Sequence, residues 1–206
     1  MTEIPHPSTP VALTGATTAR SLVQAAGASA YAALGFLVLG AAALTAYFGS
    51  NNVADPLGPI SDVLFVGVAI FLVPPVLAVG KVVDGRAGRW FDLVSWLAIA
   101  GLVISGGGQA LLVVGLIPLE SSFITFGGGL ALFLLWGLAL WVPAVRLGLL
   151  PRAVARWAVA AVVSLVLATV GWFGFPPEVG YTAAGVLGLA MIGWLVSLGR
   201  ALRRMA

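Results

Sequence analysis

The chain has very few of the residues on which most enzyme chemistry depends. It contains no cysteine, and its single histidine is His6. Without cysteine it has no disulfide framework, no thiolate metal site and no cysteine nucleophile. Since His6 lies in the N-terminal segment, no apolar run holds a histidine that ligates heme, zinc or a di-iron centre, or that forms a dyad with serine. We therefore expect no metal and no cofactor.

Charged residues are also scarce, at 8% of the 206 residues, against about 25% in a soluble domain. Apolar residues make up 61% of the chain, and mean hydropathy is +1.11. A helical membrane crossing needs roughly 20 apolar residues, and the chain has several runs of that length. A transmembrane barrel needs alternating polarity, whereas "ARWAVAAVVSLVLATV" is apolar on every face. The composition predicts an all-α integral membrane protein.

The apolar runs predict six transmembrane helices, paired as three hairpins in a single domain over residues 20–206. Residues 1–19 contain three prolines and five threonines and no lysine or arginine. This segment lacks the basic start of a signal peptide, so we expect a disordered tail. The six predicted crossings are 22–48, 62–83, 93–116, 121–146, 153–174 and 179–202.

The basic residues predict the orientation of the helices. Six crossings place both termini on one side of the membrane, and all ten lysines and arginines fall on that side. The opposite side carries Asp55, Asp62, Glu120 and Glu178. The positive-inside rule therefore predicts cytoplasmic termini, and we expect the protein in the plasma membrane. Because the cations flank apolar runs, they favour membrane lipid and not nucleic acid as a partner. The ten are Arg20, Lys81, Arg86, Arg89, Arg146, Arg152, Arg156, Arg200, Arg203 and Arg204.

Three outer carboxylates recur with one period. Asp62, Glu120 and Glu178 are each 58 residues apart, and the same spacing relates Trp136 to Trp194. An internal duplication explains this spacing, as does the similarity of any six apolar helices joined by equal loops. Each acid begins a predicted helix, where the positive end of the helix dipole favours a carboxylate. The alternative role is a proton or cation site.

Two glycine triplets lie on either side of the loop near Pro118. A phosphate-binding loop needs a strand, a tight turn and a helix start, whereas these glycines lie inside predicted helices. They predict close packing of the third and fourth helices. Ser105 and Gln109 share a polar face of the third helix, and the Gln109 amide needs a partner helix, a water or a ligand. The six glycines are Gly106, Gly107, Gly108, Gly127, Gly128 and Gly129.

Other ligand candidates lie on the remaining helices. Pro74 and Pro75 remove two backbone hydrogen bonds, and the freed carbonyls either coordinate a polar ligand or only accompany a kink. Tyr31 donates either to a ligand or to a neighbouring helix. Trp136 and Trp194 either line an aromatic pocket or fill the core.

The stretches "LGLLPRAVARWAVAAVV" and "VSLGRALRR" carry a family resemblance. Over roughly the last hundred residues, the chain resembles small bacterial multi-pass membrane proteins grouped in domains of unknown function. The resemblance implies a compact bacterial membrane protein, and it implies neither an activity nor any site residue.

These features favour a non-enzymatic membrane module. Short loops leave recognition to surfaces inside the bilayer, so we expect the protein to bind a hydrophobic small molecule or lipid. It would otherwise be an accessory subunit of a membrane complex, or associate with its own copies. The alternative is a small transporter or channel, suggested by the hairpin period, the proline pair and Gln109. An intramembrane enzyme would depend on the outer carboxylates together with Ser121 and Ser122.

Overall fold

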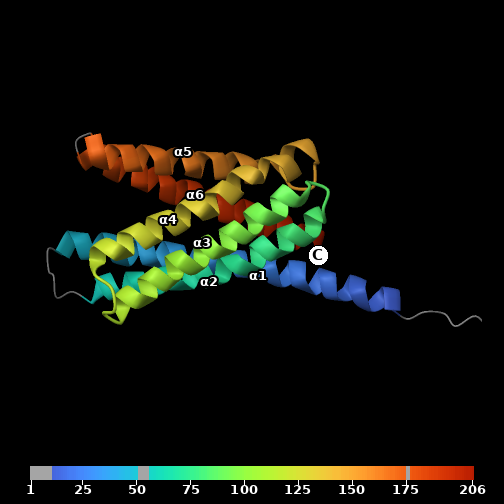
Figure 1. Cartoon of the computed structure of the whole chain (residues 1–206), viewed down its shortest axis with the longest axis horizontal. Helices are drawn as coiled ribbons and strands as arrows, with labels where there is room; N and C mark the ends of the chain where they lie inside the picture. Colours follow the sequence, from blue (N-terminus) through green and yellow to red (C-terminus); the bar gives the residue numbers. More distant parts are fainter. Residues whose placement is uncertain (1–10, 51–55, 175–176) are drawn as a thin grey trace, which may run out of the picture.

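The computed structural model describes residues 11–50, 56–174 and 177–206, and in these ranges the chain is helical without any strand. Six helices are long and apolar enough to cross a membrane. This confirms the predicted all-helical chain with six apolar spans. A short π-helix, η1 (Val142–Arg146), follows the fourth helix. The six are α1 (Val11–Ser50), α2 (Leu57–Val83), α3 (Arg89–Val113), α4 (Leu119–Ala139), α5 (Arg152–Gly174) and α6 (Pro177–Met205) (Figure 1).

The helices form a bundle of antiparallel hairpins. Each helix packs most extensively against its hairpin partner, α1 with α2, α3 with α4 and α5 with α6. The hairpins are joined where α2 packs against α3 and where α1 packs against α6, and α5 packs less extensively against α4. The start of α1 and the end of α6 lie at the same end of the bundle (Figure 1).

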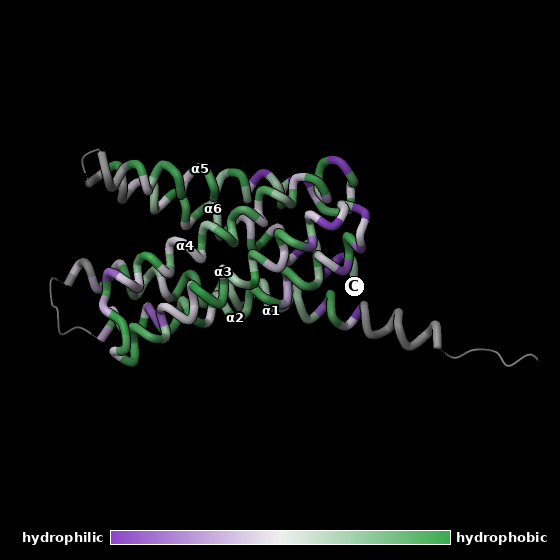
Figure 2. Tube along the Cα trace, in the orientation of Figure 1, coloured by the Kyte–Doolittle hydropathy of each residue, from purple (hydrophilic) through white to green (hydrophobic). Residues whose placement is uncertain are grey.

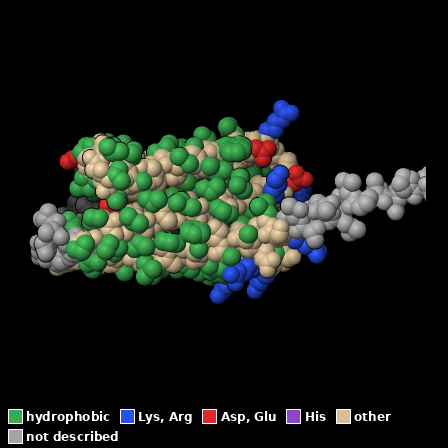
Figure 3. Space-filling view, turned by 90° about the horizontal axis from the view of Figure 1, so that it is seen from below, with side chains coloured by type: hydrophobic (Ala, Val, Ile, Leu, Met, Phe, Trp, Pro, Cys, Tyr) green, Lys and Arg blue, Asp and Glu red, His purple; other side chains and the backbone are tan. Residues whose placement is uncertain are grey.

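The helices are apolar along most of their length (Figure 2), and apolar side chains cover much of the face seen in Figure 3. Large side chains such as Trp96, Ile124 and Leu189 are 65%, 76% and 66% exposed. Lysine and arginine side chains gather at one end (Figure 3). In water an apolar surface of this extent would drive association, so the lipid chains of a bilayer are its natural solvent.

Several helices begin earlier than hydropathy predicts. The first begins at Val11, inside the segment expected to be a tail, and α2 begins at Leu57, ahead of Asp62. Residues 1–10 lie outside the described part of the chain. Hydropathy reports how much of a helix lies in hydrocarbon, while backbone hydrogen bonding continues into polar residues beyond the membrane. Apolar runs therefore underestimate helix length.

The fourth crossing, expected to run to residue 146 as one helix, instead changes form near its end. Regular α-helix stops at Ala139, and the chain continues as η1. Pro143 has no N–H to donate to the carbonyl of Ala139, so the regular ladder is broken there. The Leu147 amide instead donates to the Val142 carbonyl at 3.0 Å, which is the wider π spacing.

Candidate functional site

The third and fourth helices touch through glycine. A Cβ built on Gly129 would lie 2.7 Å from the Ser105 nitrogen and against the Gly101 carbonyl. One built on Gly108 would meet the Thr125 side chain, with Thr125 Cβ at 2.7 Å. No side chain larger than hydrogen fits at these positions without moving a backbone, so Gly101, Gly108 and Gly129 form the seam between α3 and α4.

The other glycines of the two triplets lie elsewhere. A Cβ on Gly106 would lie 2.8 Å from Ala69 of α2, while Gly107, Gly127 and Gly128 have nothing within 4 Å. Successive residues of a helix turn by about 100°, so three in a row cannot face one neighbour. The triplet on α3 is therefore divided among α4, α2 and the outer surface.

An apolar groove runs between α2 and α3, where glycine leaves space on the outside of the bundle. Its volume is about 270 Å³. The exposed side chains of Ile70 on α2 and Val103 on α3 border the groove on its two sides, and they are 62% and 64% exposed. The groove is therefore open to the bilayer and carries no polar side chain. Its lining residues are Val66, Ala69, Ile70 and Val73 from α2, and Leu102, Val103, Gly106, Gly107 and Ala110 from α3.

Gln109 and Ser105 face the interior, at 6% and 8% exposure. The Gln109 Oε1 atom is enclosed and has no hydrogen-bond partner in the described part of the chain. An amide oxygen left unpaired in apolar surroundings costs about 1–3 kcal/mol by the measure of protein mutants. Gln109 follows Gly106 by three residues on α3 and is not itself one of the groove-lining residues.

The proline pair of α2 is compensated by the first helix. Pro75 has no N–H for the Phe71 carbonyl, and that carbonyl accepts a hydrogen bond of 2.7 Å from Ser29 Oγ of α1. The α2 helix continues through both prolines as one element. Of the two carbonyls that the prolines free, the one at Phe71 is therefore already occupied and is not open to a cation or ligand.

Replacing Ser29 with alanine is expected to lower the free energy of unfolding by about 1 kcal/mol, because the Phe71 carbonyl loses its donor. Ser95→Ala is the matched control, since Ser95 Oγ donates at 2.8 Å to the Phe91 carbonyl of its own helix. In a Pro75→Ala background the helix supplies its own amide at residue 75, so Ser29→Ala should then have little effect. Thermal unfolding in detergent measures all four variants, and an equal loss in both backgrounds would contradict the assignment.

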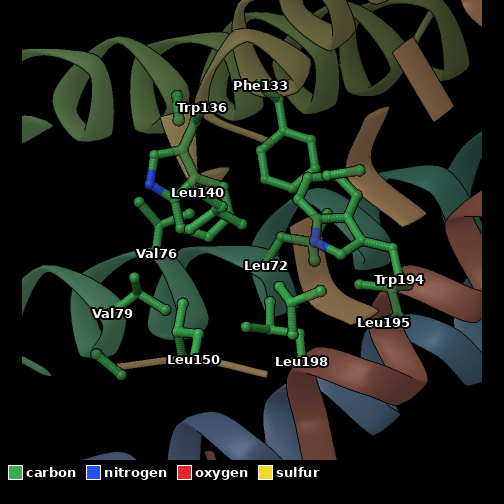
Figure 4. Close-up of a cluster of buried hydrophobic side chains, with 14 of the residues drawn as sticks. Leu72, Val76, Val79, Phe133, Trp136, Leu140, Leu150, Trp194, Leu195 and Leu198 are labelled. Atoms are coloured by element: carbon green, nitrogen blue, oxygen red, sulfur yellow. The ribbon is translucent and has the colours of Figure 1, made fainter. Parts of the chain in front are cut away.

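Trp136 and Trp194 meet in the core. Both are fully buried, and their ring centroids are 6.0 Å apart. Phe133 lies 5.7 Å from Trp136 and 5.1 Å from Trp194. Leucine and valine side chains from α2 and α6, together with Leu140 and Leu150, lie around the three rings (Figure 4). Neither indole Nε1 has a hydrogen-bond partner among the described residues. These rings fill the core between the hairpins.

Tyr31 lies where α1 meets α6. Its ring stacks under the Arg203 guanidinium, at 4.7 Å from the centroid. A Cβ on Gly199 would lie 3.0 Å from the same ring. Tyr31 is therefore engaged by the last turns of α6, at the basic end of the bundle.

The outer carboxylates occupy different helix positions. Glu120 is exposed in the first turn of α4, where it can interact with the free amides. Asp62 is half-buried at the sixth position of α2, beyond the first turn. Glu178 is the second residue of α6, but its side chain lies outside the described part of the structure, as does Asp55. The capping role predicted from the sequence is thus available to Glu120 and not to Asp62.

Three features of the structure were not predicted from the sequence. They are the Ser29 hydrogen bond to α2, the contact of Gly101 with Gly129, and the groove-lining face of α2. The serine signal was present in principle, since a hydroxyl in an apolar helix needs an acceptor. The chain matches no protein-family model, no curated protein and no solved structure.

Proposed function

We propose that this protein is a non-enzymatic module of the plasma membrane that binds a hydrophobic small molecule or a lipid chain in the groove between α2 and α3. The observation that carries the proposal is the groove itself. It lies on transmembrane helices, faces the bilayer, and is lined by nine apolar residues. Gly106 and Gly107 supply the space by lacking side chains.

The chemistry of the groove limits the ligand. Its volume of about 270 Å³ suits a single chain or a small ring system. With no polar lining residue, binding relies on apolar contact and shape. A flexible apolar chain meets these requirements better than a charged solute.

The orientation proposed with this function has both termini in the cytoplasm. All ten lysine and arginine side chains are exposed, and those visible in Figure 3 gather at the end of the bundle where α1 starts and α6 stops (Figures 1 and 3). The positive-inside rule supports a cytoplasmic location for that end.

The test fills the groove without touching the packed seam. A Cβ on Gly107 meets nothing within 4 Å, so Gly107→Leu should fold normally and place its side chain in the groove. We expect crosslinking of a diazirine-labelled fatty acid to residues 66–110 to fall about tenfold, equivalent to about 1.4 kcal/mol.

Gly128→Leu is the matched control, because Gly128 is equally open but does not line the groove. Its labelling should equal that of the unmodified chain. Labelling of residues 66–110 that survives Gly107→Leu, in a variant with unchanged thermal unfolding, would rule out the groove as the binding site.

A transporter is the second candidate, and the buried, unpaired Oε1 of Gln109 is the observation that favours it. A polar group in a transmembrane span is a frequent mark of a solute pathway. Solute flux into liposomes that Gln109→Leu abolishes, and Gly107→Leu leaves intact, would favour transport over binding in the groove.

A further inference from the structure

The basic end of the bundle is divided unequally between the hairpins. The connection from α2 to α3 carries Lys81, Arg86 and Arg89, and it also holds the acids Asp84 and Asp92. Arg86 is occupied as a cap, since its guanidinium donates to the Val82 and Val83 carbonyls at 2.9 and 3.3 Å. The positive charge of the α2–α3 connection is therefore partly balanced by Asp84 and Asp92.

The last hairpin has no such balance. Residues 121–206 contain a single acidic residue, Glu178, and it belongs to the start of α6, at the other end of the bundle. Arg203 stacks on Tyr31. Five exposed arginines remain, and in the described part of the structure they have no ion pair or hydrogen bond. We name them the hairpin arginines: Arg146, Arg152, Arg156, Arg200 and Arg204.

The packing of α5 on α6 brings the hairpin arginines to the same end of the bundle, with Arg156 the deepest of the five. The Trp157 ring lies over Gly193, whose Cβ would be 2.6 Å from it. In antiparallel helices of equal rise, Arg152, the first residue of α5 and five before Trp157, is level with the residue five after Gly193, Leu198, which lies two residues before Arg200. The end of α6 therefore lies beside the connection between η1 and α5, which carries Arg146 and Arg152.

The start of α5 adds to this positive potential. Helix N-termini are partly positive and normally favour acids. The first turn of α3 at the same end holds Asp92, whereas that of α5 holds Arg152 and no acid. An anion from outside the protein would relieve the repulsion among these groups.

The surroundings of the hairpin arginines are those of a membrane interface. Trp141 and Trp157 are 44% and 42% exposed, and Leu147 is 38% exposed beside Arg146. Exposed indoles settle at the level of lipid headgroups, which places the neighbouring guanidinium groups at the depth of the phosphates. A soluble anion would not contact these apolar side chains, but a lipid would contact both kinds of group.

We propose that the hairpin arginines bind the phosphate headgroups of anionic phospholipids, at a surface separate from the α2–α3 groove. Guanidinium groups suit this partner, since they donate paired hydrogen bonds to phosphate oxygens. Juxtamembrane arginines each strengthen binding to anionic membranes by roughly fivefold. The connection between α2 and α3 and the surface formed by the hairpin arginines would then differ in their preference for anionic lipid.

The test compares two triple variants of the full chain that remove the same charge. One is Arg152→Gln, Arg156→Gln and Arg200→Gln. The control is Lys81→Gln, Arg86→Gln and Arg89→Gln. Each is incubated with equal amounts of phosphatidylglycerol and phosphatidylcholine, and native mass spectrometry measures the ratio of the two lipids retained. We expect that ratio to fall at least about tenfold in the hairpin variant, and much less in the control.

Three results would overturn the proposal. The first is an equal fall of the lipid ratio in both variants, and the second is an unmodified chain that shows no preference for phosphatidylglycerol. The third is a preference that disappears when inorganic phosphate is added at constant ionic strength, which would make free phosphate the ligand. If the glutamine variant fails to fold, the unmodified chain and a triple variant with Arg152→Lys, Arg156→Lys and Arg200→Lys provide the test. The preference should weaken with rising salt and be largely retained with lysine.

Discussion

Replacing Trp194 with alanine is expected to lower the free energy of unfolding by about 3–5 kcal/mol, as for other large aromatic truncations in a core. The side chain is fully buried, contacts Phe133 and Trp136, and stands close to Gly137 of α4. Its removal leaves a cavity where α4 and α6 meet. Thermal or denaturant unfolding in detergent measures the loss.

Two controls separate packing from polarity. Trp194→Phe keeps much of the ring and removes an N–H that has no partner in the described part of the chain, so it should cost less than about 1.5 kcal/mol. Trp96 is 65% exposed, and Trp96→Ala should change stability by no more than about 0.5 kcal/mol. If Trp194→Phe were as damaging as Trp194→Ala, the indole N–H would have to have a partner, and Trp194 would no longer be purely a packing residue.

Gly129→Ala is expected to cost about 3 kcal/mol, at the upper end of the range for overpacking. The added methyl group would lie 2.7 Å from the Ser105 nitrogen and against the Gly101 carbonyl. Both are backbone atoms of α3, which cannot rotate away as a side chain can, so the two helices must separate. The measurement is again unfolding in detergent.

Gly128→Ala is its matched control. The two glycines are adjacent on α4 and gain the same helix propensity on substitution, but a Cβ on Gly128 meets nothing within 4 Å. Gly128→Ala should therefore be neutral or slightly stabilising. Equal destabilisation by the two substitutions would mean that α3 and α4 do not approach at Gly129.

Some glycines of the two triplets are thus needed for helix packing, and another is needed for the proposed binding. Gly129 lets the backbone of α4 touch that of α3, and Gly108 makes room for the Thr125 side chain, while Gly107 leaves an opening on the lipid-facing surface. A substitution at Gly107 can therefore test binding without disturbing the fold. Substitutions at Gly108 or Gly129 cannot, since they would change both.

Ser29 bears on the function as well as on stability. A proline pair in a transmembrane helix suggests a polar site, because it frees carbonyl groups in the hydrocarbon. Here the Phe71 carbonyl is taken by the Ser29 hydroxyl, a contact between the first two helices. This removes one of the two freed carbonyls as a ligand site, while the other belongs to Ile70, a residue that lines the α2–α3 groove.

The all-helical class and the six apolar spans follow from the sequence by itself. Both depend on composition and run length, since an apolar stretch of that length is stable only as a helix in lipid. The clustering of basic residues at helix ends is likewise visible before folding. The 58-residue period remains a prediction about the history of the chain.

The tertiary structure decided which residues of the glycine, proline and arginine patterns contact another helix or share one surface. Three consecutive glycines look equivalent in sequence, but the helical turn points one at α4, one at α2 and one at lipid. A freed carbonyl and a serine hydroxyl 42 residues apart become partners only when α1 packs on α2. The hairpin arginines become one surface only through the register of α5 on α6. In each case the interaction joins residues on different helices, and local sequence does not specify the rotation and register of one helix against another.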